Sequence, residues 1–279
     1  MSNNNYEFIK KLGSGSQGTV WKAIRLSDNK TIAVKILKIY NDKTVEAAAD
    51  EVKKLKSLAT PKCNENIVCY YGYSENPTEF QVFVEMEYIE GEDLSDYSKK
   101  FREKDEYSKL YKHLLLITKD LIKGILYIHD RDIIHSDIKP ANIMIDKNLT
   151  PKIIDFGVSC HSNDVCKLGS KKVSCCKGLV GSPAYASPEV YKDEIRYPQS
   201  DIWSLGMTLY EAATGKYPYI YKTSKPNLRD IFQAIQDEEP IKLETSNILL
   251  NDIVNKSLVK DPKDRITAIE INNMLKNYK

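Results

Sequence analysis

Residues His135–Asn142 read His-Ser-Asp-Ile-Lys-Pro-Ala-Asn, and Asp155-Phe156-Gly157 begins 18 positions after the aspartate of that stretch. Upstream, apolar residues recur at the three- and four-residue steps of a long amphipathic helix. They are Leu110, Leu114, Ile117, Leu121, Ile125 and Ile128. The helix leads into a short segment rich in Asp, His and Pro, where we expect the chemistry of the protein to lie.

The first ninety residues are predicted to consist of strands and one helix. The turn-like Ser27–Lys30 separates two strand-like runs, which predicts an antiparallel hairpin. The expected elements of this part are strands at Val20–Ile24 and Thr31–Leu37, a helix at Val45–Leu58, and strands near Ile67–Tyr73 and Gln81–Tyr88.

The remainder of the chain is predicted to be mainly helical. The strand pattern ends around Glu90–Glu92. Residues 158–182 show little periodicity and contain many Ser, Lys, Gly and Cys, and such a stretch inside a compact domain is usually functional or mobile. Helical patterns return at Asp201–Gly215, Asn227–Asp237, Leu249–Leu258 and Ala268–Lys276.

The composition is that of a globular chain. Of 279 residues, 42% are hydrophobic and 29% charged, which excludes disorder, collagen and coiled coil and allows one large domain or two lobes. The net charge of +2 argues against a nucleic-acid partner. No apolar run approaches the roughly 18 to 20 residues of a membrane helix. Without a secretory signal, we expect a cytoplasmic protein, with the nucleus left open, and six reduced cysteines.

Two features near the N-terminus suggest phosphate binding. Gly13–Gly18 matches G-x-G-x-x-G, whose glycines let backbone amides approach phosphates. A strand follows instead of the helix of a dinucleotide fold, so the glycines form either a phosphate-covering hairpin or a plain turn. Lys35 lies in an apolar strand, where a buried ammonium needs a partner such as Glu51; alternatively it projects from a solvated face.

Taken in order, these motifs resemble the protein kinase superfamily. The resemblance covers residues 6 to 276 and rests on the glycine hairpin with Val20, Ile32–Lys35, His135–Asn142, Asp155–Gly157, Ser187–Glu189, Asp201–Gly206 and Arg265. It implies an α+β, two-lobed protein-kinase-like fold in a single domain over residues 1–279. The expected lobes are a small antiparallel-sheet lobe with one helix at 1–89 and a larger, mainly helical lobe at 90–279.

The resemblance implies a catalytic loop at His135–Asn142 and an activation segment at Asp155–Glu189. Asp137 would orient the acceptor hydroxyl and take its proton. Lys139 would stabilise charge on the transferred phosphoryl group, and a lysine at this position resembles serine/threonine specificity. Ser182 matches a family position that contacts these two residues.

The implied cofactors are ATP and Mg²⁺. Lys35 would hold the inner phosphates while paired with Glu51, and Asn142 and Asp155 would be the magnesium ligands. The residues expected around the nucleotide are Leu12, Val20 and Ala33 as apolar walls, Gly13, Gly15 and Gly18 in the hairpin, Met86 behind the adenine, Glu87, Tyr88 and Ile89 along its edge, and Asp93 at the ribose. Any of the apolar residues could instead belong to the core.

Other matches imply structural roles. Glu189 and Arg265 resemble a buried pair that pins the substrate-binding segment, and Asp201 resembles the residue that anchors the catalytic-loop backbone.

The sequence departs from the family pattern at several places, among them the following. Ser136 replaces an arginine that in the family meets a phosphate on the activation segment, so we hypothesise that activity does not depend on such phosphorylation. Ser162, Ser170 and Ser174 remain candidate phosphorylation sites. The activation segment also carries Cys160, His161, Cys166, Cys175 and Cys176, which form either a redox or metal switch or, more simply, ordinary thiols.

The sequence therefore predicts an ATP-dependent protein kinase acting on Ser/Thr, with Tyr acceptance left open. It most resembles the mitogen-activated protein kinase kinases, whose members phosphorylate both Thr and Tyr. The alternative is a pseudokinase scaffold that binds partners without phosphoryl transfer. We expect a monomer with a protein substrate and neither nucleic acid nor membrane as a partner.

Overall fold

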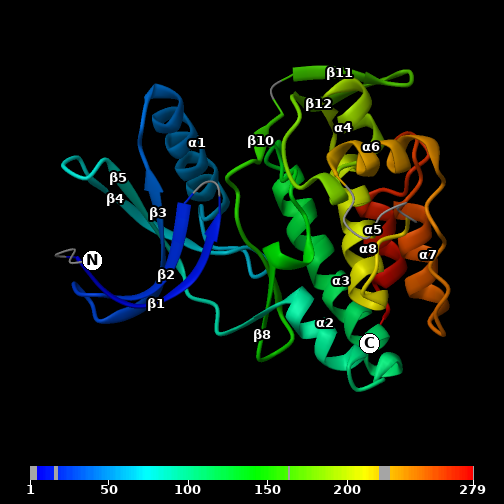
Figure 1. The fold of residues 1–279 in the computed structure, drawn as a ribbon, viewed down its shortest axis with the longest axis horizontal. Helices are drawn as coiled ribbons and strands as arrows, with labels where there is room; N and C mark the ends of the chain where they lie inside the picture. Colours follow the sequence, from blue (N-terminus) through cyan, green and yellow to red (C-terminus); the bar gives the residue numbers. More distant parts are fainter. Residues whose placement is uncertain (1–4, 16–17, 163, 220–226, 279) are drawn as a thin grey trace. The chain divides into compact units, whose positions relative to one another are not determined.

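The computed structural model describes residues 5–15, 18–162, 164–219 and 227–278 (Figure 1). The chain divides into two compact units, Met1–Glu90 and Gly91–Lys279, called here the first and second units. The division falls one residue beyond the predicted lobe boundary. An antiparallel sheet dominates the first unit and helices the second, as the sequence predicted for an α+β kinase-like fold.

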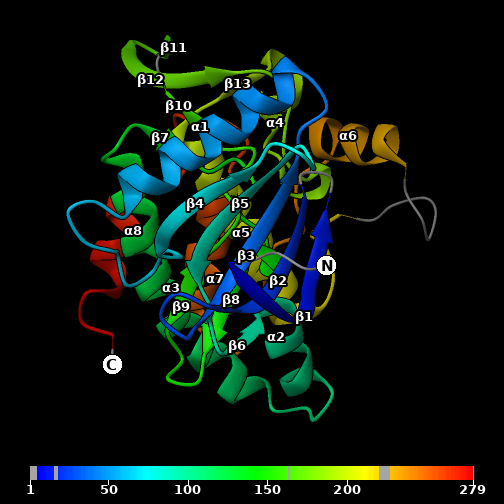
Figure 2. The same ribbon diagram turned by 90° about the vertical axis from the view of Figure 1, so that its left-hand side faces the viewer.

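The first unit is a five-stranded antiparallel sheet with one helix beside it (Figures 1 and 2). The strands run in the order β1-β2-β3-β5-β4, and alternate residues of β3 such as Ile32, Val34 and Ile36 enter the core. Its elements are β1 (Tyr6–Gly15), β2 (Gly18–Arg25), β3 (Lys30–Lys38), α1 (Asp42–Leu58), β4 (Tyr70–Asn76) and β5 (Gln81–Glu87). Strand β1 was not predicted, and β4 begins three residues later than expected.

The second unit is built around helix α5, which is buried on nearly every side. Pro198 opens this helix at its first turn, and Gly215 ends it in the left-handed conformation, with φ of 74°. The predicted apolar stripe of α3 is buried. The helices are α2 (Leu94–Arg102), α3 (Tyr107–His129), α4 (Pro188–Asp193), α5 (Pro198–Thr214), α6 (Leu228–Asp237), α7 (Ile248–Ser257) and α8 (Ala268–Leu275). Both α2 and α4 were missed by the sequence analysis.

Short strands of the second unit position its loops. β6 (Gly91–Asp93), β8 (Ile143–Asp146) and β9 (Pro151–Ile153) form one sheet, and β7 (Ile133–Ile134) pairs with β10 (Cys160–His161). The third sheet contains β11 (Asp164–Leu168), β12 (Lys171–Lys177) and β13 (Ile195–Arg196). The expectation that residues 158–182 are irregular is therefore wrong, because β11 and β12 form a hairpin around Gly169 and Ser170.

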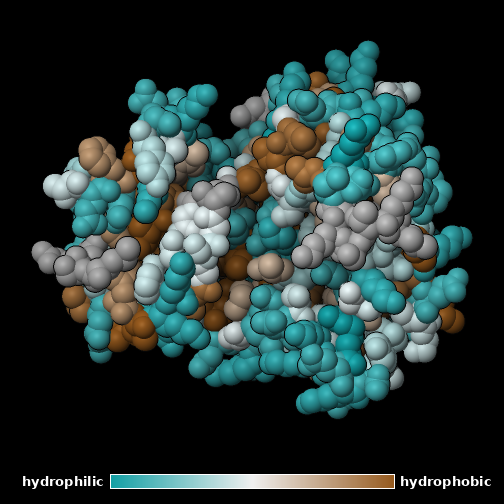
Figure 3. Space-filling view, in the orientation of Figure 1, coloured by the Kyte–Doolittle hydropathy of each residue, from teal (hydrophilic) through white to brown (hydrophobic). Residues whose placement is uncertain are grey.

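The surface around α2 is hydrophilic, in keeping with the exposed lysines Lys99 and Lys100 (Figure 3). Among the helices that the structure describes, none has the length and apolar character needed to cross a membrane.

Candidate active site

The glycine hairpin joins β1 to β2. A Cβ on Gly13 or Gly15 would meet no atom within 4 Å, whereas one on Gly18 would lie 2.4 Å from the carbonyl oxygen of Ile36. Gly18 has a φ of 152°, so a side chain is excluded here by both backbone conformation and the neighbouring strand. Ser16 and Gln17, at the expected tip, lie outside the described residues.

Lys35 and Glu51 form the predicted ion pair. The Nζ atom of Lys35, on β3, donates a hydrogen bond of 2.6 Å to Oε1 of Glu51, on α1. Both residues are buried, with exposed fractions of 5% and 3%. Burial makes an unpaired charge costly, so each residue fixes the position of the other. The alternative of a solvated Lys35 is wrong.

The residues predicted to contact adenine lie on β1, β2, β3 and β5. Ala33 and Met86 are buried partners in the β3–β5 register, and Val20 pairs with Lys35 across β2 and β3. Leu12, on β1, is 44% exposed, so it is not a core residue. The edge predicted to meet adenine, Glu87–Ile89, is half-buried.

Asp93 caps a helix in this structure. Its side chain accepts a 2.9 Å hydrogen bond from the backbone N–H of Asp96 in the first turn of α2. A carboxylate that caps a helix is fixed in direction and can still use its remaining lone pairs. The predicted ribose contact stays a prediction.

Asp201 anchors the catalytic loop. This buried aspartate of α5 accepts hydrogen bonds from the backbone N–H groups of His135, at 2.9 Å, and Ser136, at 2.8 Å. His129 Nε2 donates a third, at 2.8 Å. Burial alone would raise the pKa of Asp201, but the His129 hydrogen bond and charge bring that pKa below its ordinary value. The anchoring contact predicted for Asp201 is confirmed.

Asp137 lies at the centre of a polar cluster. Its Oδ1 accepts from the backbone N–H of Ser182 at 2.8 Å. Its Oδ2 accepts from Lys139 Nζ at 2.7 Å and from Asn142 Nδ2 at 2.8 Å. Lys139 Nζ also donates to Ser182 Oγ at 2.7 Å. The structure thus brings together the three predicted catalytic-loop residues and Ser182, which lies 45 positions after Asp137.

A glycine that the sequence analysis did not single out permits this approach. Gly181 has a φ of 91°, and a Cβ there would lie 2.2 Å from the carbonyl oxygen of Ser136. Only glycine fits so close to the catalytic loop without moving one of the two backbones. The G-S-P sequence at Gly181–Pro183 was the available signal, and it marks a turn but not this contact.

Buried aromatic packing supports the start of the activation segment. The rings of His135 and Phe156 meet edge to face, with centroids 4.9 Å apart. Burial lowers the pKa of His135 below its usual range, so the ring is neutral. Its Nδ1 accepts from the backbone N–H of Asp137, which leaves Nε2 to donate to the carbonyl of Ile154. Asp155 adopts a left-handed φ of 63°.

The cysteines do not match the prediction. All six cysteines lie in the described ranges, where they form three disulfides and none is free, so the expectation of six reduced thiols is wrong. The pairs are Cys63 with Cys69, Cys160 with Cys176, and Cys166 with Cys175. Pairing of β11 with β12 brings Cys166 close to Cys175, and sequence spacing alone does not reveal any of the three pairs. The described residues contain no cluster of three or more metal-ligating side chains.

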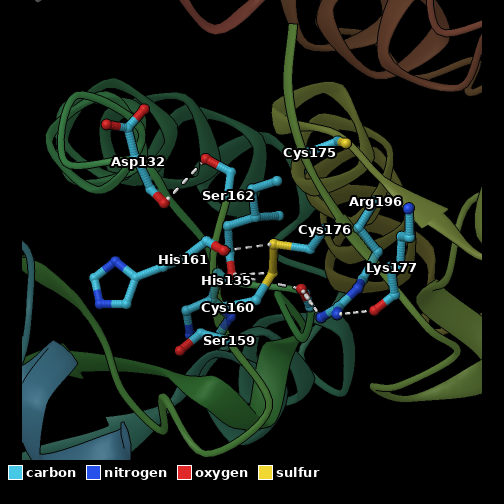
Figure 4. Close-up of a disulfide and its surroundings, with 12 residues drawn as sticks. Asp132, His135, Ser159, Cys160, His161, Ser162, Cys175, Cys176, Lys177 and Arg196 are labelled. Carbon is cyan, nitrogen blue, oxygen red and sulfur yellow. Dashed lines mark hydrogen bonds between the residues drawn. A yellow bond between two sulfur atoms is a disulfide. The ribbon is translucent and has the colours of Figure 1, made fainter. Parts of the chain in front are cut away.

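Two disulfides cross-link the activation segment. Cys160–Cys176 joins β10 to the end of β12 (Figure 4). Cys166–Cys175 packs in an apolar cluster with Tyr197. Of the candidate phosphorylation sites, Ser162 is buried and donates to the carbonyl of Asp132, so a kinase would not reach it. Ser170 is exposed at the hairpin turn, and Ser174 is half-buried.

The predicted pair Glu189–Arg265 is also confirmed. Arg265 binds both carboxylate oxygens of Glu189, at 2.9 and 3.0 Å, and both side chains are buried. Burial alone would raise the pKa of Glu189, but the charge and hydrogen bonds of Arg265 lower that pKa below its ordinary value. The pair holds the end of the activation segment, in α4, against the segment that precedes α8.

Comparison with known proteins identifies the family. The model of the protein kinase domain matches residues 6–275. The chain therefore belongs to the protein kinase family, as the order of its motifs predicted.

Several curated relatives share about a third of their residues with this chain. Mitogen-activated protein kinase kinase 3 of Arabidopsis thaliana is 32% identical over 93% of this chain. The serine/threonine-protein kinase pakG of Dictyostelium discoideum is 33% identical over 93% of it, and mitogen-activated protein kinase kinase 1 of Arabidopsis thaliana 30% identical over 95%. The chain spans 47%, 20% and 72% of the lengths of these three relatives. The predicted likeness to mitogen-activated protein kinase kinases agrees with two of them.

Proposed function

We propose that this chain transfers the γ-phosphoryl group of MgATP to Ser and Thr hydroxyls of a protein substrate. The observation that carries the proposal is the cluster of Asp137, Lys139, Asn142 and Ser182. Phosphoryl transfer needs positioning and charge neutralisation rather than a covalent enzyme intermediate, and this cluster offers a carboxylate and an ammonium in fixed positions.

Asp137 has the capacity to accept the proton of a substrate hydroxyl. A carboxylate offers about four lone-pair sites, and Asp137 uses three of them in hydrogen bonds to Ser182, Lys139 and Asn142. One site remains for an incoming hydroxyl. The three existing hydrogen bonds fix the direction of the carboxylate, which favours proton transfer to it in one orientation.

Lys139 is suited to stabilise charge on the transferred group. Its ammonium has three donors, of which two are directed at Asp137 and Ser182. The third can meet a phosphoryl oxygen. The same lysine ties Ser182 to the catalytic loop, so it couples the activation segment to the reacting groups.

Asn142 and Asp155 fit the ligand chemistry of magnesium. The amide nitrogen of Asn142 makes both of its hydrogen bonds to Asp137, which leaves the amide oxygen to meet a cation. Asp155 adds a carboxylate, and Mg²⁺ prefers oxygen ligands of these two kinds. When bound, MgATP supplies the phosphoryl group together with a cation that neutralises its charge.

The first unit would bind the rest of the nucleotide. Lys35, held by Glu51, would meet the inner phosphates, and the backbone amides near Gly13, Gly15 and Gly18 would cover them. The apolar walls would come from Leu12, Val20, Ala33 and Met86, with Glu87 and Ile89 at the adenine edge and Asp93 at the ribose.

The choice of acceptor residue follows from Lys139 and Ser182. Their contact resembles serine/threonine kinases, and relatives named serine/threonine-protein kinases support this specificity. Acceptance of Tyr, as in mitogen-activated protein kinase kinases, is the second candidate. We further propose that the chain acts as a cytoplasmic monomer on a protein partner; the near-neutral net charge supports a protein over a nucleic acid.

Replacing Asp137 by Asn tests the proposal against the pseudokinase alternative. We expect Asp137→Asn to lower kcat by about 10²- to 10⁴-fold and to leave nucleotide affinity nearly unchanged. The assay uses labelled ATP and an array of Ser, Thr and Tyr peptides. Asp252→Asn, on the exposed surface of α7, is the matched control and should keep full activity.

The outcomes separate the candidates. Transfer that depends on Asp137 supports a kinase, and the phosphorylated residue type decides between Ser/Thr and dual specificity. Nucleotide binding without transfer in the unmodified chain would instead support a pseudokinase.

A further inference from the structure

Arg196 is a buried arginine that no sequence motif singled out. It ends β13 and is only 6% exposed. Its Nη1 donates to Ser136 Oγ at 3.0 Å and to the carbonyl of Val158 at 3.3 Å, and its Nη2 donates to the carbonyl of Lys177 at 2.8 Å. Figure 4 shows Arg196 and Lys177 beside the Cys160–Cys176 disulfide.

The partners of Arg196 are neutral oxygens. Within the described ranges, no carboxylate forms an ion pair with its guanidinium, and burial lowers its pKa below the ordinary value. Its Nε is buried without a partner in that part of the chain. Burying a cation is costly, and among the residues that the structure describes only the charge of Asp201 opposes the effect of burial on the pKa of Arg196. A guanidinium in this place therefore requires that its acceptors be well positioned.

These acceptors come from three segments that must keep fixed relative positions for phosphoryl transfer. Ser136 immediately precedes Asp137 in the catalytic loop. Val158 immediately follows Asp155–Gly157, and Lys177 ends the second strand of the activation-segment hairpin. One rigid, planar group therefore connects the catalytic loop to both arms of the activation segment.

We infer that Arg196 is a positioning residue for phosphoryl transfer, an inference that rests on the proposed kinase function. It supplies from β13 the guanidinium that the family resemblance places at position 136, where this chain has Ser136. The hydroxyl of Ser136 accepts from that guanidinium, so the two positions have exchanged roles: the loop residue is the acceptor and the distant residue the donor.

The inference gives a physical basis for the hypothesis that activity does not depend on activation-segment phosphorylation. The donors directed at the catalytic loop and activation segment are occupied by a hydroxyl and two carbonyls, so a phosphate is not needed to hold the guanidinium. The Cys160–Cys176 disulfide joins residues close to two of these acceptors, Val158 and Lys177, and supports the same geometry. The phosphatase-treated protein should therefore keep its activity.

The test compares Arg196→Met with Arg102→Met in the full chain. Arg102 is a matched control because its half-buried guanidinium also donates to main-chain carbonyls, those of Glu211 and Ala212, on α5. We expect Arg196→Met to lower kcat per folded molecule by about 10- to 100-fold, as for a misplaced catalytic group, with the KM for ATP changed less than about twofold. Arg102→Met should keep the kcat of the unmodified chain.

Arg196→Lys adds a conservative rescue. A lysine keeps the positive charge but replaces the planar guanidinium, with its several donors, by a compact ammonium. The kcat of Arg196→Lys should therefore fall between those of Arg196→Met and the unmodified chain. If Arg196→Met does not fold, Ser136→Ala removes one acceptor from a half-exposed position and should lower kcat by a smaller factor.

Three results would overturn the inference. They are an Arg196→Met or Ser136→Ala protein with unchanged kcat, an equal loss in Arg102→Met, and a collapse of activity after phosphatase treatment. An unmodified chain that transfers no phosphoryl group would instead contradict the proposed function. In that case, hydrogen exchange at residues 134–138 and 176–178 still tests the contact, because Arg196→Met should lower their protection and Arg102→Met should not.

Discussion

The catalytic loop and the activation segment are held in place by different kinds of contact. A single buried carboxylate, Asp201, accepts from two consecutive backbone N–H groups of the loop. The activation segment is instead held by two disulfides, by Arg196 and by the Glu189–Arg265 pair. The loop thus depends on one residue 66 positions away from His135, whereas the activation segment depends on several links of different kinds, and its two disulfides join residues only 9 and 16 positions apart.

The difference indicates how each region should fail. Loop geometry should respond to the charge state of Asp201 and His135, which are buried and hydrogen-bonded. The geometry of the activation segment should change when one link is removed, but only in part, because the other links still hold it. The two regions meet at Lys139 and Ser182 and at Arg196 and Ser136, through side-chain contacts that leave the backbone anchors of each region separate.

The largest effect is expected at the end of the activation segment. Arg265→Met leaves the Glu189 carboxylate buried without its partner, which should lower the free energy of unfolding by about 3 to 5 kcal/mol. Chemical denaturation measures the loss. Glu189→Met/Arg265→Met removes both charges and should be less destabilised than the sum of the single variants. Strict additivity would show that the two side chains do not act as a pair.

Asp201→Asn tests the other side of the comparison. The amide offers one acceptor oxygen and places an NH₂ group against backbone donors, so we expect a loss of about 3 kcal/mol. Transfer activity should fall with it, because Ser136 and Asp137 lose their anchor. Hydrogen exchange should show lower protection in residues 134–137 but not in β11 and β12. Equal loss in both regions would contradict separate anchoring.

The double variant Cys160→Ser/Cys176→Ser tests the activation segment as Asp201→Asn tests the catalytic loop. Removing a cross-link between residues 16 apart should cost about 3 kcal/mol. The activation segment should exchange faster, while the amides of His135 and Ser136 keep their protection through Asp201. Cys63→Ser/Cys69→Ser, in the first unit, is the control and should leave exchange in the activation segment unchanged. Loss of loop protection in the first double variant would show that the disulfide also holds the catalytic loop.

The same contrast separates what the sequence could predict from what it could not. The loop anchor and the pairs Lys35–Glu51 and Glu189–Arg265 were predicted, because each position falls within a motif of fixed order. The fold class followed from the order of the kinase-like motifs, and most helices followed from periodicity.

The activation segment was predicted poorly. The hairpin was missed because its period-2 signal is short and rich in Lys and Ser, although Gly169-Ser170 is a turn signal. The cysteine pairing and Arg196 depend on tertiary proximity, and no local pattern encodes these contacts, which join residues 6 to 16 apart in the disulfides and 60 apart for Arg196 and Ser136.

The smallest expected effect comes from pH and concerns His135. Burial lowers the pKa of this ring in the folded protein, whereas the unfolded chain has the ordinary value of 6.5. Below that value the unfolded state binds more protons than the folded state. The contribution of neutral His135 to the free energy of unfolding is therefore fully present above about pH 6.5. It is lost as pH falls toward the lowered folded pKa, by at most about 1.4 kcal/mol per pH unit.

A protonated His135 would also lose the hydrogen bond that its Nδ1 accepts from the backbone N–H of Asp137, because both ring nitrogens would then be donors. Urea unfolding between pH 7 and 5.5 should show this slope, and His135→Gln should flatten it. His113→Gln is the control: that ring also has a lowered pKa but is less buried, so its removal should change the slope less. A slope unchanged in His135→Gln would mean that the loop is not the acid-sensitive region and that the contrast with the activation segment does not extend to pH.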